Sequence, residues 1–534
     1  MWIRPARLFP VKTGKLAGFR PWRYIMSAVA TAPGARASLK NVPIFINGYP
    51  QPAKSSRKGP VFNPSTGEQI ADVPFCTPQE TAEVIQSAHS AFPAWRDTPV
   101  VERARIMFRL VALLEKNAEE LARIVSLEHG KTHAEAVGSV RRGIEMVEFA
   151  CGIPTLSMGD TLHNIAQDVD CETYSHPLGV CVGITPYNFP LMVPLWMFPI
   201  AITCGNTFVL KPSEKVPLSA MRLAELCTEA GLPPGVLNVV HGDKECVDAL
   251  LTHPLVQAVS FVGSTPIAKY IYETATRHGK RCQANGGAKN HILVMPDADL
   301  DKAVTALQTS AFGCAGQRCM AGSLAIAIGK AGDPLVDSLV ASANKMKVGR
   351  TDVKSDADMG PVTTKPHLEG LIANIDKGAK EGAKLARDGR GIKVAEAPGG
   401  FYLGPTIFDR VEPGMHVSKT ELFGPVLSVT RVPDLEAAIR LTNESEFGNG
   451  AVIYTRDGHA AREFKHRAGA GMIGINVGVP APMAMFPFTG AKGSFFGDLH
   501  IQGKEGIAFY TQSKMILSRW HSGGAAGEFV TTRG

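Results

Sequence analysis

Apolar strand-like runs and helical patterns alternate along the middle of the chain, and this alternation constrains the fold more than any other feature. The strands are expected at 179–184, 207–210, 236–240, 258–262 and 292–295, and the helices at 219–230, 245–251, 265–278 and 300–309. Alternation at this spacing predicts a parallel, doubly wound α/β sheet, and the region 333–476 repeats it. With 534 residues, the chain has room for more than one domain.

A long uncharged segment opens this region. From Pro177 to Leu210 there is no Asp, Glu, Lys or Arg, a length sufficient to span a bilayer. Prolines at 186, 190, 194 and 199 interrupt the segment, and a lone helix in lipid cannot satisfy the backbone groups that they free. The segment therefore predicts a buried strand, a turn and a tightly packed helix, and no membrane anchor. Upstream, one helix is expected to begin at Thr77 and another to run from Val101 to Leu121.

The positive charge is concentrated at the beginning of the chain. The net charge is +7, but eleven basic residues precede the first acidic residue, Glu68, and the rest carries more acidic than basic residues. This distribution argues against nucleic-acid binding. Residues 1–38 contain arginines and apolar residues but no acidic residue, which predicts a mitochondrial transit peptide; a plastid peptide or a disordered basic tail is the alternative. Residues 521–534 are expected to form a disordered tail.

The ten cysteines show no C-x-x-C pair and no spacing typical of metal ligands, so no metal site is expected. This pattern is typical of reduced thiols in an intracellular compartment, most of them buried. Cys319 differs because Gly316 and Arg318 precede it closely. A nucleophilic thiolate needs room for its substrate and a nearby N–H group or cation. These features indicate a candidate nucleophile and leave a packing role open.

Polar groups also follow several of the predicted strands. Lys211 and Glu214 follow the strand 207–210, at the edge where open α/β sheets bind ligands; a solvated loop is the alternative. Ser264 begins a helix whose N-terminus can face a phosphate, although such strand–glycine–helix turns are common. Asn188 lies in an apolar turn, where its amide is either structural or a donor to an oxyanion.

Five segments, taken together and in this order, resemble the aldehyde dehydrogenase superfamily. They are residues 185–190, 211–214, 261–264, 316–319 and 421–426. The resemblance implies an α/β fold with a Rossmann-type NAD-binding domain, an α/β catalytic domain and a β-hairpin oligomerisation arm. It extends from about residue 42 to residue 520.

The implied domains interleave along the chain. The NAD-binding domain comprises 39–155 and 178–286, the catalytic domain 287–490, and the oligomerisation arm 156–177 and 491–520. The hairpin near 156–177 is expected to pair with a strand near 506–516 across a subunit interface. Because the family usually builds a tetramer from dimers, a homotetramer is expected.

Further segments resemble the methylmalonate-semialdehyde dehydrogenase branch of the superfamily. They are residues 194–199, 277–281, 288–291, 316–320 and 509–512. Most aldehyde dehydrogenases have, at the position of Asn285, a glutamate that activates water; this branch has asparagine there and passes its acyl group to coenzyme A. Gly286, Ile292 and Cys314 depart from the branch pattern. Cys314 is expected to pack, and a disulfide with Cys319 under oxidation is the alternative.

The resemblance also implies roles for individual residues. Cys319 attacks the aldehyde, while the Asn188 side chain and the Cys319 backbone N–H hold the oxyanion. The implied NAD-binding residues are Thr185, Tyr187, Lys211, Glu214, Lys215, Ser264 and Glu421. Glu421 matches the residue at the nicotinamide-side ribose, and Lys211 and Glu214 match those at the adenosine ribose, where a carboxylate disfavours the 2′-phosphate of NADP.

Two arginines are implied to bind the carboxylate of the substrate. Arg318 matches one of them, and Arg142 matches the other with a one-residue ambiguity, because Arg141 precedes it. A desolvated carboxylate needs a cationic partner, although a surface ion pair is the alternative for either arginine alone.

The implied function is NAD-dependent, CoA-acylating oxidation of methylmalonate and malonate semialdehydes to propionyl-CoA and acetyl-CoA, with loss of the β-carboxylate. It would proceed through a Cys319 thioester, in the mitochondrial matrix, in valine and β-alanine/pyrimidine catabolism. The implied partners are the semialdehyde, NAD and CoA, and neither nucleic acid nor a membrane. A hydrolytic, NAD-dependent aldehyde dehydrogenase that yields a free acid is one alternative. An inactive structural or binding member of the fold is another.

Overall fold

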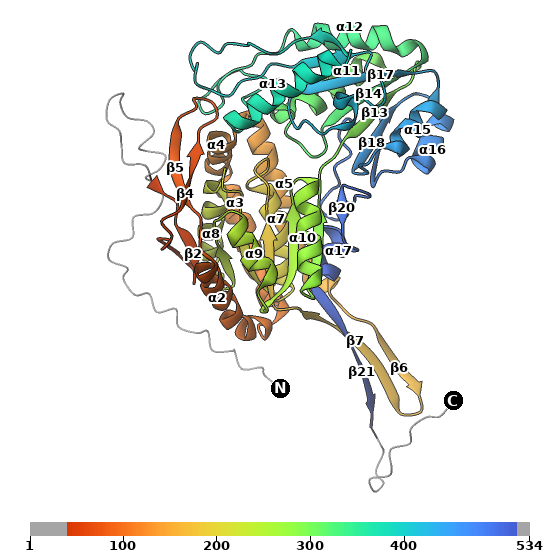
Figure 1. Cartoon of the computed structure of the whole chain (residues 1–534). Helices are drawn as coiled ribbons and strands as arrows, with labels where there is room; N and C mark the ends of the chain where they lie inside the picture. Colours follow the sequence, from red (N-terminus) through yellow and green to blue (C-terminus); the bar gives the residue numbers. More distant parts are fainter. Residues whose placement is uncertain (1–39, 521–534) are drawn as a thin grey trace. The chain divides into compact units, whose positions relative to one another are not determined.

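Two α/β sheets, a small sheet and a projecting arm make up residues 40–520, the part that the computed structural model describes (Figure 1). The expected transit peptide 1–38 and tail 521–534 lie outside the described residues. The small sheet has the order β1-β5-β4 and consists of β1 (Lys40–Asn41), β4 (Lys58–Phe62) and β5 (Gln69–Pro74).

The first large sheet has eight strands. In spatial order they are β20 (Phe495–Phe496), β12 (Arg281–Asn285), β11 (Val256–Val262), β8 (Val180–Ile184), β9 (Thr207–Lys211), β10 (Leu237–Val239), β2 (Ile44–Ile46) and β3 (Tyr49–Gln51). The strands from β12 to β10 are parallel, whereas β20, β2 and β3 run antiparallel to their neighbours at the two edges. The expected doubly wound parallel sheet is therefore confirmed.

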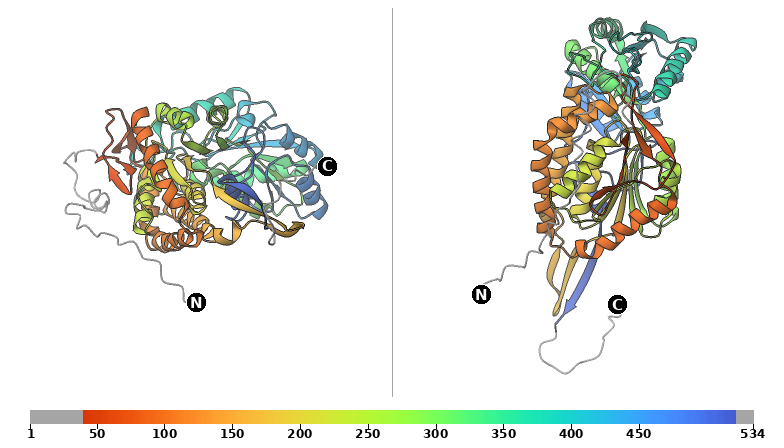
Figure 2. Two further views of the ribbon diagram at one scale, coloured as in Figure 1. Left: turned by 90° about the horizontal axis from the view of Figure 1, so that it is seen from below. Right: turned by 90° about the vertical axis from the view of Figure 1, so that its left-hand side faces the viewer.

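Helices cover both faces of this sheet (Figures 1 and 2). One face packs on α2 (Pro78–Arg96), α9 (Lys244–Thr252) and α10 (Thr265–Arg277). The other carries α7 (Met192–Thr203) and α8 (Leu218–Glu229), with α3 (Val100–Lys116), α4 (Ala118–His129), α5 (His133–Cys151) and the short α6 (Ile153–Leu156) packed beyond them. Thr77 and Glu80 form a capping box at the start of α2, as its sequence predicts.

The single helix expected from Val101 to Leu121 is wrong, because α3 and α4 are separate helices. Asn117 interrupts them with φ −103° and ψ 12°, outside the helical range. Its side-chain amide donates to the Leu113 carbonyl at 2.7 Å, so it satisfies the end of α3 instead of continuing the helix. Apolar spacing does not register such a break, because both helices turn an apolar face toward the same core.

The uncharged segment folds as its prolines predict. It forms β8, a turn, α7 and β9, and all residues of α7 are buried, including Pro199 inside the helix. No helix among residues 40–520 has the length and apolar character needed to cross a membrane. The hydrophobicity of the segment is explained by burial between the sheet and α5.

The second large sheet has seven strands. In spatial order they are β15 (Lys384–Arg387), β16 (Thr406–Asp409), β17 (Val426–Val432), β14 (Gly322–Ile328), β13 (Asn290–Val294), β18 (Gly450–Tyr454) and β19 (Met472–Ile475). Only β15 is antiparallel to its neighbour. One core contains α11 (Leu300–Phe312), α12 (Gly332–Ala343), α13 (Lys365–Lys380) and α14 (His416–Lys419), and the opposite core contains α15 (Leu435–Glu444) and α16 (Gly458–Arg467). A single 3₁₀ turn occurs at Gly329–Ala331, whereas Gly313–Gly316 is a turn in which Cys314 and Ala315 have left-handed backbone angles.

The arm is a three-stranded antiparallel sheet that projects from the body (Figures 1 and 2). It consists of β6 (Thr161–Ala166), β7 (Val169–Pro177) and β21 (Thr511–Arg519). The expected pairing across a subunit interface is corrected: β21 pairs with β7 of the same chain, from Thr511 opposite Pro177 to Arg519 opposite Val169.

The second part of the arm is also shorter than the expected range 491–520. β20 lies within that range but hydrogen-bonds to β12, where it covers an edge of the eight-stranded sheet. The following helix, α17 (Gly503–Phe509), packs against α6 and α7. Within the range 491–520, therefore, only β21 belongs to the arm sheet.

Candidate active site

Two cavities meet at Cys319. The larger, of about 1090 Å³, lies beyond the carboxyl ends of β8, β9 and β11 and is closed by residues 366–374 and 421–423. The smaller, of about 320 Å³, is lined by α5, α7 and the loops 314–320 and 479–488. Cys319 lines both cavities. A group bound in either cavity can therefore reach the same sulfur atom.

The loop that carries Cys319 has an unusual backbone. Cys314, Ala315 and Gly316 follow one another with φ of 52°, 51° and 71°. For residues with a Cβ this conformation costs roughly 1–2 kcal/mol each. A Cβ at Gly316 would lie 2.0 Å from the Gly424 carbonyl oxygen, so only glycine fits there. Such strain is typical of functional loops that the surrounding structure holds in place.

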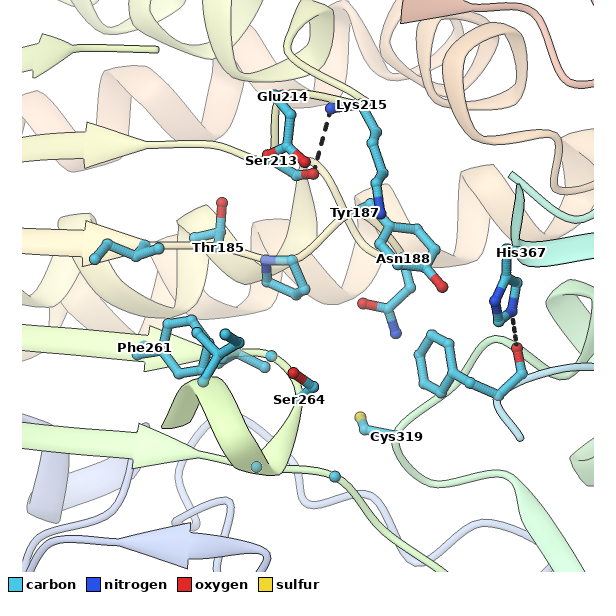
Figure 3. A pocket seen from close by; sticks show the side chains of 18 of the residues that line it. Thr185, Tyr187, Asn188, Ser213, Glu214, Lys215, Phe261, Ser264, Cys319 and His367 are labelled. Atoms are coloured by element: carbon cyan, nitrogen blue, oxygen red, sulfur yellow. Dashed lines mark hydrogen bonds between the residues drawn. The ribbon is translucent and has the colours of Figure 1, made fainter. Parts of the chain in front are cut away.

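Side-chain amides hold the backbone of the loop that carries Cys319. Asn290 and Asn449 each donate to the Cys319 carbonyl at 2.9 Å. Asn188 donates from Nδ2 to the Gln317 carbonyl at 3.0 Å, and Figure 3 shows its amide facing the same space as the thiol. The expected juxtaposition of Asn188 and Cys319 is thus present, and an oxyanion formed at the sulfur would lie near this amide.

Lys131 contacts the backbone of Asn188. Its buried ammonium donates to the Asn188 carbonyl at 2.8 Å and lies 4.0 Å from the centre of the Phe189 ring. Sequence reasoning missed Lys131 and Asn449, because neither lies in a segment that the resemblance singles out. Asn290 lay within such a segment, 288–291, but nothing in the sequence indicated that it contacts Cys319.

The electrostatic environment keeps the Cys319 thiol protonated at neutral pH. Burial and the nearby Glu421 carboxylate raise its pKa to about 12, against the opposing effects of backbone N–H groups and Arg318. Burial also raises the pKa of Glu421 to about 7, although that carboxylate accepts the Ala288 N–H at 3.0 Å. Deprotonation of Cys319 therefore requires a proton acceptor or an additional positive charge at the junction of the cavities.

The seven residues expected to bind a dinucleotide all line the larger cavity. They are Thr185, Tyr187, Lys211, Glu214, Lys215, Ser264 and Glu421, most of which are labelled in Figure 3.

The two lysines of this set have neighbours in the cavity, whereas two hydroxyls have no hydrogen-bond partner among the described residues. Lys211 lies 3.4 Å from Glu214, and the Lys215 ammonium lies 4.8 Å from the centre of the Tyr187 ring. Ser264 precedes α10 without capping it through its side chain, and the enclosed Thr185 hydroxyl has no partner among residues 40–520. A free helix N-terminus and a carboxylate at the end of a strand suit the phosphates and ribose of NAD.

In the smaller cavity, Arg318 lies among three hydrogen-bond acceptors. Its guanidinium contacts the Cys314 sulfur, the Thr309 carbonyl and the Glu135 carboxylate, each at 3.2 Å. Glu135 also accepts the Cys314 N–H at 2.6 Å, so one carboxylate steadies both the strained loop and the arginine. Cys314 is buried, in agreement with a packing role, and additionally accepts a hydrogen bond from Arg318.

The two adjacent arginines lie in different environments. Arg142 lines the smaller cavity, where it donates to Glu145 at 3.0 Å and to the Pro482 carbonyl at 2.6 Å. Arg141 points to solvent and lies 3.7 Å from Glu115. The position of Arg142 therefore agrees with the expected assignment.

The aldehyde dehydrogenase family model matches residues 51–516. The chain belongs to the aldehyde dehydrogenase family. Malonate-semialdehyde dehydrogenase 2 of Geobacillus kaustophilus is 53% identical over 483 residues, which cover 90% of this chain and 99% of the relative.

Solved structures lead to the same branch of the family. Methylmalonate-semialdehyde dehydrogenase from Oceanimonas doudoroffii has a TM-score of 0.89 and 49% identity, covering 91% of this chain and 99% of its own. A structure from Sinorhizobium meliloti 1021, complexed with NAD, has a TM-score of 0.90 and 47% identity over 91% of this chain and 99% of its own. The resemblance to the family, to this branch and to its fold is confirmed.

In this aldehyde dehydrogenase, Asn285 ends β12 and is buried. Neither its amide oxygen nor its amide nitrogen has a partner among the described residues. Most buried polar groups in proteins have a hydrogen-bond partner, so this amide calls for an explanation. It is also the position at which the resemblance implies a glutamate in hydrolytic members of the family.

Proposed function

We propose that this aldehyde dehydrogenase oxidises malonate semialdehyde and methylmalonate semialdehyde with NAD and transfers the resulting acyl group to coenzyme A. One observation carries the proposal: Asn285, and no carboxylate, occupies the position from which hydrolytic relatives are expected to activate water. The names of the relatives support the substrate class, and a neighbour complexed with NAD supports the cofactor.

The residues of the chain would divide the reaction between the two cavities. In the smaller cavity, Arg318 and Arg142 hold the substrate carboxylate, and Cys319 attacks the aldehyde carbon. The Asn188 amide and the Cys319 backbone N–H donate to the oxyanion, each contributing about 3 kcal/mol to the lowering of the barrier. NAD, when bound in the larger cavity, supplies the acceptor for the hydride that leaves this carbon.

A thioester on Cys319 results, and the thiol of coenzyme A displaces the Cys319 sulfur from it. The β-carboxylate leaves as carbon dioxide and a proton from solvent replaces it on the α-carbon, so that malonate semialdehyde yields acetyl-CoA and methylmalonate semialdehyde yields propionyl-CoA. Asn285 has no basic site with which to deprotonate water, so the thioester would persist until coenzyme A arrives.

A hydrolytic reaction is the second candidate, because Glu421 lies near Cys319 and its pKa is raised to about 7. A carboxylate with such a pKa can act as a general base at neutral pH. The decisive measurement is NADH formation from malonate semialdehyde with and without coenzyme A, with the product identified. Turnover that is independent of coenzyme A and yields a free acid would refute the acylating reaction, and no turnover of any aldehyde would favour an inactive member.

Substitution of Asn285 tests the carrying observation directly. Asn285→Glu should introduce turnover that does not require coenzyme A, with a rate of acyl-enzyme hydrolysis raised about 10²-fold or more. Asn285→Gln, of similar size but without a basic site, is the matched control and should leave that rate low.

We also propose a homotetramer built as a dimer of dimers, in the mitochondrial matrix, active in valine and β-alanine/pyrimidine catabolism. The arm supports the assembly, because it exposes Leu162, Ile165, Tyr174, Met515 and Leu517. The composition of residues 1–38 supports import. Light scattering tests the assembly, and fusion of residues 1–38 to a fluorescent protein tests the location.

A further inference from the structure

Gln502 is a polar side chain in the smaller cavity to which the proposed reaction gives no role. It is only 3% exposed and lines that cavity together with Cys319, Arg142 and Arg318. Its amide oxygen is enclosed and has no partner among residues 40–520. That oxygen is an acceptor, whereas the Nε2 atom of the same amide donates to no described group, so its two N–H donors are available to a ligand in the cavity.

The backbone of Gln502 is strained as well. Its φ of 77° and ψ of 170° lie in a region that is populated almost only by glycine. Contacts on both sides hold it there: Phe488 donates to the Ile501 carbonyl at 2.8 Å, and Gly503 donates to the Ala484 carbonyl at 3.2 Å. Backbone strain of this kind clusters at ligand sites, and here it holds an amide against a cavity that the described side chains leave its N–H groups free to serve.

The charges around Gln502 indicate what it binds. Each arginine of the cavity already has a carboxylate partner, Glu135 for Arg318 and Glu145 for Arg142. A substrate carboxylate must compete with these glutamates, so an additional uncharged donor would strengthen its binding. The glutamine amide provides two N–H donors, whereas a carboxylate offers only acceptors.

The location of Gln502 assigns it to this end of the substrate. Asn188 lines the larger cavity beside Cys319, where the proposed oxyanion forms, whereas Gln502 lines the smaller cavity. We propose that Gln502 is a specificity-determining residue whose side-chain amide donates to the carboxylate of the semialdehyde. This role rests on the proposed function, because it requires a carboxylated substrate.

Two substitutions separate the amide from the backbone strain. Gln502→Leu removes the donors and keeps the strain, whereas Gln502→Gly removes both. Both variants should lower kcat/KM for malonate semialdehyde about 10- to 100-fold, the range expected for a hydrogen bond to a charged group. Both should change kcat/KM for propanal less than about threefold, because propanal has no carboxylate.

Binding provides a readout that does not depend on turnover of the carboxylated substrate. The dead-end ligand 3-hydroxypropanoate should inhibit propanal oxidation, with an inhibition constant about tenfold higher in both variants. Gln502→Gly should melt no lower than the wild type, because glycine relieves the strain. Arg410→Gly is the matched control: Arg410 is exposed, has φ 51° and lines neither cavity, so it should leave both substrates unaffected.

The outcomes distinguish the two proposals. If the wild type prefers malonate semialdehyde and both variants keep that preference within threefold, the role of Gln502 is overturned and the proposed function stands. If Gln502→Gly melts well below the wild type, the residue is structural and its role is likewise overturned. If the wild type does not prefer the carboxylated aldehyde, the substrate class fails and the role of Gln502 fails with it.

Discussion

Replacing Arg318 by leucine should abolish the preference for carboxylated aldehydes. The substrate loses a charge-assisted hydrogen bond, worth about 1.5–3 kcal/mol. A second loss arises from Glu135, whose side chain is only 16% exposed and would remain without its cationic partner. If the substrate carboxylate approaches to about 6 Å, an effective dielectric constant of about 20 gives a repulsion of about 3 kcal/mol.

Together these terms predict that the ratio of kcat/KM for malonate semialdehyde to that for propanal falls about 10³- to 10⁴-fold. The ratio is the appropriate readout, because Arg318 also lowers the pKa of Cys319 and that effect is common to both substrates. The assay is NADH formation from each aldehyde at saturating coenzyme A.

The double variant Arg318→Leu/Glu135→Gln isolates the repulsion. Removal of the glutamate charge should recover about 10²-fold of the lost ratio, because it removes about 3 kcal/mol of repulsion. Among single arginine variants, Arg142→Leu should lower the ratio and Arg141→Leu should not, because only Arg142 lines the cavity. A ratio within threefold of the wild type in Arg318→Leu would refute the reasoning.

Two further predictions concern the larger cavity. With a pKa of about 12, the thiolate fraction of Cys319 in the ligand-free protein rises tenfold per pH unit. The rate at which iodoacetamide alkylates the Cys319 peptide, measured by mass spectrometry from pH 6 to pH 9, should rise in parallel. A plateau of this rate below pH 8 would contradict the prediction. Glu214→Gln should raise the ratio of NADP to NAD turnover about tenfold by removing a charge that repels the 2′-phosphate, whereas an unchanged ratio would remove Glu214 from the ribose site.

Much of the fold follows from local features of the sequence. Most strands and helices between 179 and 309 were predicted close to their observed bounds, because a buried parallel strand is a short apolar run and a covering helix carries an apolar stripe. β12 (Arg281–Asn285), which carries Asn285, was not predicted, because its residues are mostly polar or charged. The prolines of the uncharged segment correctly excluded a membrane helix. The break at Asn117 was not predictable in this way, since apolar spacing continues across it.

In the candidate site too, some residues could be predicted from the sequence and others could not. Cys319, Asn188 and Glu421 could be named because each lies in a segment that resembles the family. The residues that contact this site could not be named from the sequence. Glu135 accepts the Cys314 N–H across a sequence separation of 179 residues, and Lys131, between α4 and α5, donates to the Asn188 carbonyl. No local pattern encodes such contacts, because they exist only when separate elements pack together.

The sequence alone determined the α/β class, the family, the candidate nucleophile and the asparagine at position 285, since each depends on residue type and local order. Only the tertiary structure decided that Arg142 and not Arg141 faces the cavity, and that β21 pairs within its own chain. It alone placed Gln502, whose amide oxygen has no partner among residues 40–520, in the cavity that Cys319 also lines. The physical reason is that orientation, burial and backbone strain are set by packing between segments far apart in the chain.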